Sequence, residues 1–137
     1  MTNFKAYASA HAEELHQLLR ALCRIPAPSH FEDARAVFCK RWLEQNGCGA
    51  VRIDGVDNVI CEIGVREDND LVLLMAHTDT VFPDKKPMPL QERGGRIFCP
   101  GVGDDTANLA ILLFAARYFA RCGKAPAVGV LFVANAC

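Results

Sequence analysis

The chain has 137 residues, of which 51% are hydrophobic and 23% are charged, and its formal net charge is −1. This balance is typical of a single folded domain and excludes an intrinsically disordered chain. It also excludes a nucleic-acid-binding protein, because neutralising phosphates requires a basic excess. No segment reaches the roughly 20 apolar residues of a membrane span, so no membrane partner is expected.

Two helices are expected first in the chain. Leucines recur at helical spacing between Asn3 and Arg24, and two prolines in Ile25–Pro28 end that pattern. Ser29 and Glu32 then have the spacing of a capping box, which predicts a second helix that runs to Asn46. We expect its buried face to carry Ala34, Val37, Phe38 and Trp42.

Strands and one further helix fill the rest of the chain. A hairpin is expected around Gly94-Gly95, and Lys85-Lys86 is expected at a charged loop tip. The segment Thr106–Arg121 predicts a buried helix, ended by Gly123. The other expected strands are Val51–Ile53, Asn58–Ile63, Leu71–Ala76 and Ala127–Ala136. The last two are apolar without alternation, which is typical of strands covered on both faces, and the pattern as a whole predicts an α/β layered sheet.

Seven cysteines are present, and no two have the C-x-x-C spacing of a thiolate metal site. An odd number of cysteines also argues against a disulfide framework. Most of them lie in apolar periodic segments, where cysteine behaves as a small hydrophobic residue. The sequence therefore predicts free thiols and a reducing, cytoplasmic location.

His77 and Asp79 follow directly after the apolar strand Leu71–Ala76. Ligand sites in α/β sheets lie at the carboxyl ends of strands, and residues two apart in extended chain point to the same side. An imidazole can ligate a metal while a carboxylate holds its other nitrogen. The alternative is a buried histidine satisfied by hydrogen bonds, and this segment alone leaves both interpretations open.

Asp104 and Asp105 form a second acidic site, after Gly101-Val102-Gly103 and before the third helix. Aspartate is a common N-cap residue, so one carboxylate here has an ordinary structural explanation. Two adjacent carboxylates at a buried helix start would repel each other without a nearby positive charge. The helix N-terminus would supply part of that charge, and a divalent metal would supply more. A dinucleotide loop is excluded, because Thr106 replaces the third glycine and two carboxylates would repel a pyrophosphate.

Two segments together resemble the dinuclear zinc exopeptidases and amidohydrolases, such as peptidase T, glutamate carboxypeptidase, aminoacylase and succinyl-diaminopimelate desuccinylase. They are Leu73–Pro83, which contains His77-Thr78-Asp79, and Cys99–Ala107, which contains Gly103-Asp104-Asp105. Ile25–Ser29 and Asp57–Val59 are also similar to the opening segments of that family. The resemblance implies a three-layer α/β/α catalytic domain with a mostly parallel sheet.

The resemblance further implies a role for each site residue. His77 would ligate one metal, Asp79 would orient His77, and Asp104 would bridge two metals, with a cis peptide between Asp104 and Asp105. Two Zn²⁺ ions per full-length chain are implied, and Co²⁺ or Mn²⁺ would suit the same ligands. The implied reaction is hydrolysis of amide bonds in small peptides by a metal-activated water.

Residues 1–137 depart from the family by ending before its paired glutamates, one of which is the general base. They are therefore expected to be the N-terminal part of a catalytic domain, without the lid and dimerisation domain and without the C-terminal half. We expect the full-length protein to form a homodimer. The fragment is expected to be inactive, to bind zinc weakly and to self-associate through an exposed final strand. Two other functions stay open: an N-acyl-amino-acid deacylase of the same family, and a non-catalytic α/β binding or scaffold module.

Overall fold

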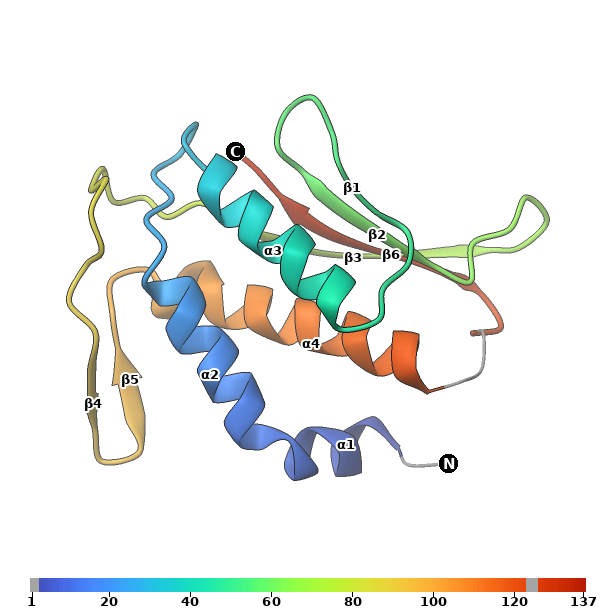
Figure 1. Ribbon diagram of the computed structural model, residues 1–137, viewed down its shortest axis with the longest axis horizontal. Coiled ribbons are helices and arrows are strands. Elements are labelled where there is room, and N and C mark those ends of the chain that lie inside the picture. The colour runs from blue at the N-terminus through green and yellow to red at the C-terminus, as the bar shows by residue number, and fades with distance from the viewer. Residues whose placement is uncertain (1–2, 123–125) are drawn as a thin grey trace.

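The computed structural model describes residues 3–122 and 126–137 (Figure 1). The expected first helix is divided into α1 (Phe4–Ala10) and α2 (Ala12–Cys23). The division falls at His11, whose φ of −119° and ψ of 24° are not helical. Asn3 caps α1, because its side-chain oxygen accepts a hydrogen bond from the Ala6 N–H at 2.8 Å.

Helix α3 (Asp33–Gln45) starts later than the capping box predicted. The Ser29 hydroxyl does not cap it and donates to Asp79 instead. The expected buried face was wrong for Ala34 and Val37, which are exposed, whereas Phe38 and Trp42 are partly buried against the core. The residues of α3 that the fold buries are Arg35, Ala36, Cys39 and Leu43.

Four strands form the main sheet, in the order β1-β2-β6-β3. Their bounds are Val51–Ile53 for β1, Val59–Ile63 for β2, Leu71–His77 for β3 and Gly129–Asn135 for β6. Only β3 and β6 are parallel, and they pair from Leu71 with Gly129 to His77 with Asn135. Because β1 with β2 and β2 with β6 are antiparallel, the α/β fold class is confirmed with a mixed sheet rather than a mostly parallel one.

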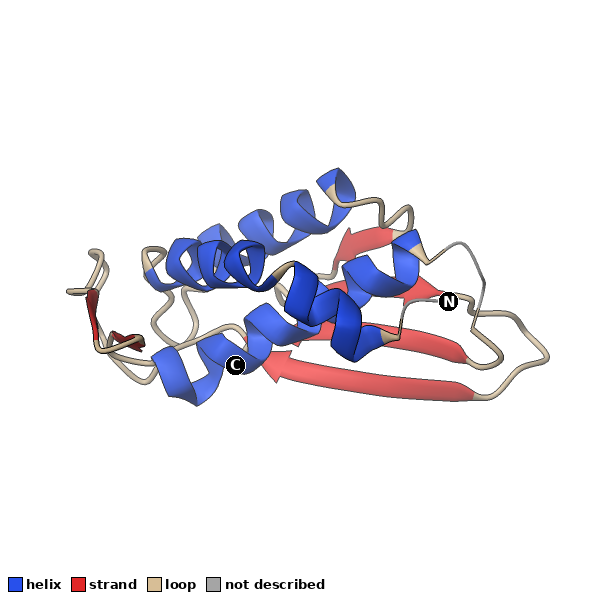
Figure 2. Ribbon diagram, turned by 90° about the horizontal axis from the view of Figure 1, so that it is seen from below, coloured by secondary structure: helices blue, strands red, loops and turns tan. Residues whose placement is uncertain are grey.

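Helices cover one face of this sheet in the described part of the chain, so a second helix layer is not found there (Figure 2). Strand β3 lies at the sheet edge, and Leu71, Leu73 and Met75 are 54%, 54% and 55% exposed. The expectation that β3 is covered on both faces is therefore wrong for these residues. The last strand, β6, is an interior strand, so the exposed apolar edge belongs to β3 and not to the end of the chain.

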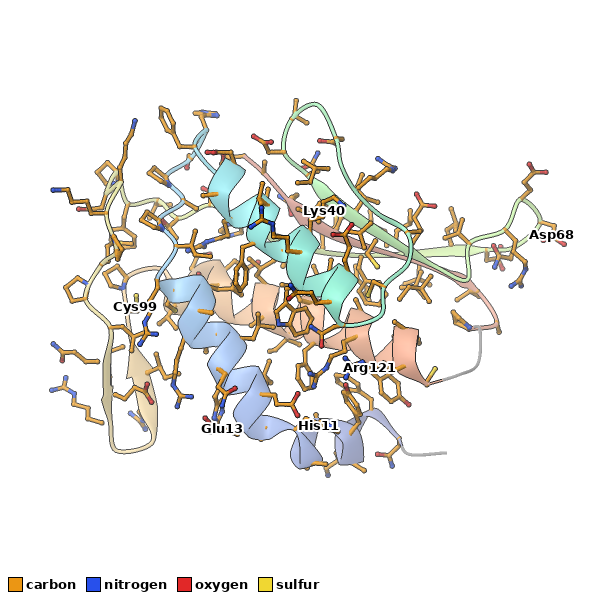
Figure 3. All side chains as sticks on the ribbon, in the orientation of Figure 1. His11, Glu13, Lys40, Asp68, Cys99 and Arg121 are labelled. Atoms are coloured by element: carbon orange, nitrogen blue, oxygen red, sulfur yellow. The ribbon has the colours of Figure 1, made fainter. Side chains whose placement is uncertain are left out.

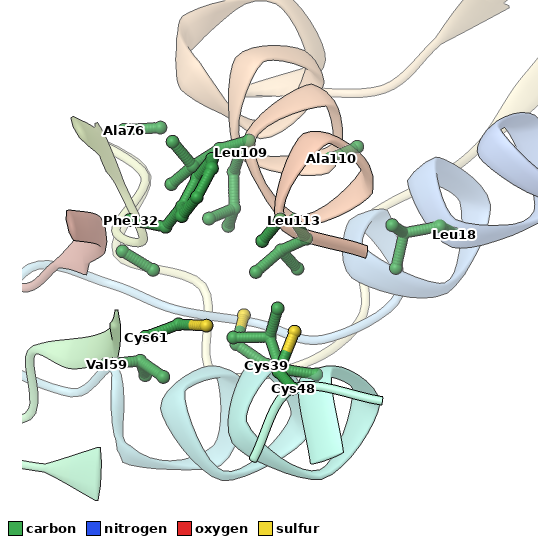
Figure 4. Packing of buried hydrophobic residues seen from close by; sticks show 14 of the residues in the cluster. Leu18, Cys39, Cys48, Val59, Cys61, Ala76, Leu109, Ala110, Leu113 and Phe132 are labelled. Carbon is green, nitrogen blue, oxygen red and sulfur yellow. The ribbon is translucent and has the colours of Figure 1, made fainter. Parts of the chain in front are cut away.

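Helix α4 (Ala107–Arg121) forms the centre of the core. Leu109 and Leu113 pack between the sheet and the other helices, close to Phe132 of β6 (Figure 4). The thiols of Cys39, Cys48 and Cys61 belong to the same cluster. Ile111 is 48% exposed, so the helix is buried on most but not all of its circumference. The expected stop at Gly123 lies outside the described residues. No disulfide joins any of the seven cysteines, all of which lie in the described residues, and five of them are buried.

A two-stranded hairpin, β4 (Gln91–Arg93) and β5 (Arg96–Phe98), projects beyond the layers (Figure 1). It contacts α2 through Glu92, whose two carboxylate oxygens accept from Arg20 at 2.7 and 2.9 Å. The expected hairpin is confirmed. Among the described residues, none of the helices has both the length and the apolar character needed to cross a membrane.

Candidate metal centre

His77 is the last residue of β3 and lies beside Asn135 of the parallel strand β6. The turn that carries Asp68 lies at the opposite end of the sheet (Figure 3). Three segments converge near His77: the one after β3, the one before α3 and the irregular turn η1 (Val102–Thr106) before α4. A site at the carboxyl end of parallel strands is where α/β folds place their ligands.

The His77 ring contacts a carboxylate on each side. Its Nδ1 lies 2.8 Å from Asp79 Oδ1, and because a carboxylate can only accept, Nδ1 carries the proton and donates it. Its Nε2 lies 3.2 Å from Asp104 Oδ1. The Asp79 contact fixes the ring orientation and leaves Nε2 directed at Asp104.

Burial and the neighbouring carboxylates shift the pKa of His77 in opposite directions. Burial lowers the pKa of His77, but the hydrogen bond to Asp104 and the charge of Asp79 outweigh burial and raise it above its ordinary value. A proton on Nε2 therefore stabilises the chain when no metal is bound. A metal on Nε2 would have to displace that proton, so metal binding at this atom would weaken as the pH falls.

The two adjacent aspartates have different environments. The Asp104 side chain is 82% exposed, whereas Asp105 accepts from the His77 backbone N–H at 3.1 Å and from Asn108 Nδ2 at 2.5 Å. Neither carboxylate is fully buried, so repulsion between the two is a weaker argument for a metal than the sequence suggested. Asp105 joins the end of β3 to the start of α4, and Asp104 is the carboxylate with free coordination capacity. The peptide between the two aspartates is cis, as the resemblance implied.

Sequence reasoning missed Ser29 as a site residue. Its hydroxyl donates to Asp79 Oδ2 at 2.6 Å, so both oxygens of this buried carboxylate have a donor. The backbone positions Ser29, because Thr80 N–H donates to Ala27 O at 2.7 Å and Pro28 forms a parallel bridge with Thr80. The serine was assigned to a helix cap because its true partner is 50 residues away in the chain.

Arg35 was also missed, and it connects the segments beneath the site. It is 2% exposed, and its guanidinium donates to Thr78 O at 2.8 Å and Thr106 Oγ1 at 3.3 Å. It also donates to the carbonyls of Leu22 at 3.0 Å and Ile25 at 2.7 Å. One buried side chain thus fixes the residue after His77, the residue after Asp105 and the end of α2 relative to one another.

The residues that could hold a metal are His77 and Asp104. An imidazole nitrogen and a carboxylate oxygen suit Zn²⁺, and the partner on Nδ1 is the arrangement usual for metal-bound histidine. Within residues 3–122 and 126–137, no three His, Cys, Asp or Glu side chains cluster closely enough to hold a metal together. The donor chemistry therefore fits a metal, but these residues supply two ligands where a zinc site generally needs three or more.

Comparison with known proteins identifies the family and the fold. Residues 58–137, which include both acidic segments, match the profile of peptidase family M28. The chain belongs to this family. No curated protein sequence matches this M28 chain.

Solved structures share the fold of the M28 chain. Aminopeptidase PepT from Bacillus cereus is 20% identical with a TM-score of 0.72, and the match covers 90% of this chain and 36% of PepT. Human carnosine dipeptidase 1 is 17% identical with a TM-score of 0.74, and the match covers 95% of this chain and 33% of the dipeptidase. YXEP from Bacillus subtilis, described as a dinuclear metal binding peptidase of the M20 family, is 21% identical with a TM-score of 0.61, over 94% and 36%. The chain thus spans about a third of the length of these three proteins.

Proposed function

We propose that this chain contributes part of the metal site of a peptidase that hydrolyses amide bonds in small peptides. The observation that carries the proposal is the His77 ring, with Nδ1 held by Asp79 at 2.8 Å and Nε2 facing the exposed carboxylate of Asp104 at 3.2 Å. Membership of a peptidase family supports the reaction class. The similarity in fold to YXEP, which is described as a dinuclear metal binding peptidase, supports a site with two metals.

In this proposal, His77 Nε2 and the Asp104 carboxylate would hold the metals, with Asp104 as the ligand that two metals would share. When bound, the metals, which we propose to be zinc, act as Lewis acids and lower the pKa of a water molecule, which is the chemistry that amide hydrolysis needs. Asp79 and Ser29 keep the imidazole in the tautomer that presents Nε2 to a ligand. Asp105 keeps the backbone of His77 beside η1, so that the two ligands stay together.

We place the general base and the remaining ligands outside these residues. Glu32 is an acidic residue that contacts the segment after β6, where it accepts on Oε1 from the backbone N–H groups of His30 at 2.9 Å and Cys137 at 3.2 Å. It is 3% exposed, so water does not reach it readily, and we assign it to holding these loops together and not to the role of general base. The chain on its own is therefore proposed to be inactive and to form the N-terminal part of the catalytic domain.

Titration of the chain with Zn²⁺ or Co²⁺, by calorimetry or by cobalt absorption, tests the proposal. We expect micromolar or weaker binding that His77→Ala and Asp104→Ala each abolish. His16→Ala is the matched control, because this exposed histidine of α2 contacts only Glu13, at 4.0 Å, among the ion pairs of the described residues. Binding that survives both site variants would refute the ligand assignment, and tight binding of two metals would refute the ligand count.

A substrate panel on the whole protein separates the remaining alternatives. Cleavage of di- and tripeptides supports the peptidase, whereas cleavage of acylated amino acids supports a deacylase of the same architecture. A binding or scaffold module would show neither activity with metal, and His77→Ala would leave its ligand binding unchanged.

A further inference from the structure

A pocket of about 270 Å³ lies between α2 and α3, and Arg117 of α4 forms part of its wall. Leu18 and Ala21 of α2 and Phe38 and Trp42 of α3 supply its apolar lining. About 15 Å of helix separates Arg117 from the N-terminal end of α4, which adjoins the candidate metal site. The pocket is therefore a feature separate from that site.

The guanidinium of Arg117 is only partly used within the fold. The residue is 3% exposed, and its Nη1 donates to Glu14 Oε2 at 2.5 Å. Its Nε and Nη2 are buried and have no hydrogen-bond acceptor among the residues that the structure describes. Buried donors of a charged group are unfavourable without an acceptor, and folded proteins rarely leave them in that state. An oxygen acceptor supplied by a ligand would satisfy both nitrogens.

The two unused nitrogens have the geometry that binds a carboxylate. Nε and Nη2 share one edge of the planar guanidinium and donate in parallel, so they match the two oxygens of a carboxylate. The chain uses this pairing elsewhere, because Arg20 donates from Nε and Nη2 to the two oxygens of Glu92 at 2.7 and 2.9 Å. Arg117 has the same edge inside the fold, and the described residues place no carboxylate on it.

Aromatic rings hold this guanidinium in place. Its central carbon lies 4.1 Å from the centroid of the Phe114 ring and 5.7 Å from that of the Trp42 ring. An aromatic face attracts the cation but is a weak hydrogen-bond acceptor, so it does not replace an oxygen. The charge balance also favours an anion. Glu14 is the one acidic residue of the lining, and the positive charges of both Arg117 and Arg121 act on it.

We propose that this pocket binds a small organic carboxylate, whose oxygens accept from Nε and Nη2 of Arg117 and whose apolar body packs against Phe38 and Trp42. Glu14 keeps its bond to Nη1, so the ligand adds a second carboxylate to the guanidinium and does not displace the first. Glu14 and Gln17 are exposed side chains of the α2 wall, and they can turn aside to admit a carboxylate to the buried edge. The volume accommodates one aromatic ring with a short acid arm.

NMR titration of the chain with phenylacetate, in the presence of a chelator, tests the inference. The Nε–Hε signal of Arg117 should shift, together with the indole N–H signal of Trp42. Phenylacetamide has the same ring but no charge, and it should bind at least about tenfold more weakly, because hydrogen bonds between two charged groups are lost. Acetate lacks the ring and should also bind more weakly than phenylacetate.

Two variants with matched controls locate the site. Arg117→Lys keeps the charge but has no paired N–H edge, so it should lose the preference for the acid over the amide. Arg121→Lys makes the same change in the same helix outside the pocket lining and should keep that preference. Gln17→Trp should abolish phenylacetate binding, because it fills the pocket from an exposed position that the core does not need for folding. Gln91→Trp, on the hairpin, should leave binding unchanged.

Equal binding of phenylacetate and phenylacetamide, or an Arg117 signal that does not move, would overturn the inference. Binding that survives Gln17→Trp would overturn it as well, even where Arg117→Lys does not fold. Shifts confined to residues around His77 would place the carboxylate at the candidate metal site and would also refute the pocket. Because the titration contains no metal, its outcome is independent of the metal-site proposal.

Discussion

Replacement of Arg35 by methionine tests whether one buried side chain holds the site together. The change removes the guanidinium from Thr78 O and Thr106 Oγ1, whose residues are 0% and 1% exposed. The Leu22 carbonyl keeps a bond from the Ile25 N–H at 3.0 Å, and the Ile25 carbonyl is only partly buried, so the losses at these two groups are smaller. Two buried polar groups without this donor lose about 1–3 kcal/mol each, or about 4 kcal/mol together.

Part of that loss is recovered. Burial lowers the pKa of Arg35, which reflects the penalty of keeping its charge inside the protein, and its Nε has no hydrogen-bond partner in the described residues. Removing the buried charge and the unpaired Nε stabilises the folded chain by about 1 kcal/mol. The net loss of stability is therefore about 3 kcal/mol. With an m-value of about 2 kcal/mol per molar urea, the unfolding midpoint should fall by about 1.5 M.

Urea unfolding followed by circular dichroism measures this shift. Arg41→Met is the matched control, because it removes an exposed arginine from the same helix and should change the stability by less than about 0.5 kcal/mol. If Arg35→Met is as stable as the unaltered chain, the free-energy penalty of burying the charge equals the stabilisation from its hydrogen bonds. The guanidinium would then not be what stabilises the arrangement of these segments.

Three further changes probe other parts of the structure. Gly101→Ala should destabilise the chain by about 1–3 kcal/mol in thermal unfolding, because its φ is +74° and an added Cβ would lie 2.7 Å from Thr80 Cγ2. Glu14→Gln should remove an acid-dependent part of the stability. The hydrogen bond from Arg117 lowers the pKa of Glu14 below 4.5, so this part is present above pH 4.5 and is lost as the pH falls through the folded-state pKa. Leu73→Lys, on the exposed edge strand, should reduce self-association in sedimentation experiments.

Each of these changes has a control on a comparable residue. Gly103→Ala places a Cβ in open space and should be tolerated, and equal losses at both glycines would contradict the steric argument. Glu67→Gln should leave the pH dependence unchanged, whereas an unaltered acid profile in Glu14→Gln would refute the role of that ion pair. Val56→Lys alters a 69% exposed turn residue, and if it reduced association as much as Leu73→Lys, net charge rather than the strand edge would be responsible.

Local patterns predicted the parts of this fold that depend on near neighbours. The i, i+2 spacing of His77 and Asp79 is enough to bring both to one side, and they form a hydrogen bond of 2.8 Å. The Gly94-Gly95 hairpin and the final helix followed from turn and helix signals in the same way. These features needed no knowledge of which segments meet in space.

Features that depend on distant segments were not predictable in this way. An apolar run such as Leu71–His77 fits a strand, but it does not tell whether the strand is buried or lies at an edge, or whether its neighbours are parallel. No local pattern marked Arg35, since the four groups that receive its hydrogen bonds are 10 to 71 positions away. Ser29 had a plausible local partner in Glu32, and only the folded chain brings it to Asp79.

The hairpin of β4 and β5 lies in the sequence between the two halves of the candidate metal site, with His77 before it and Asp104 after it. A Cβ added at either tip glycine, Gly94 or Gly95, would meet nothing within 4 Å, and among the ion pairs of the described residues the pair of Arg20 and Glu92 is the one that joins the hairpin to a helix. Exposed loop tips of this kind tolerate insertions well. An epitope or a fluorophore-binding peptide could therefore be inserted at the tip as a label, leaving the segments on either side in register.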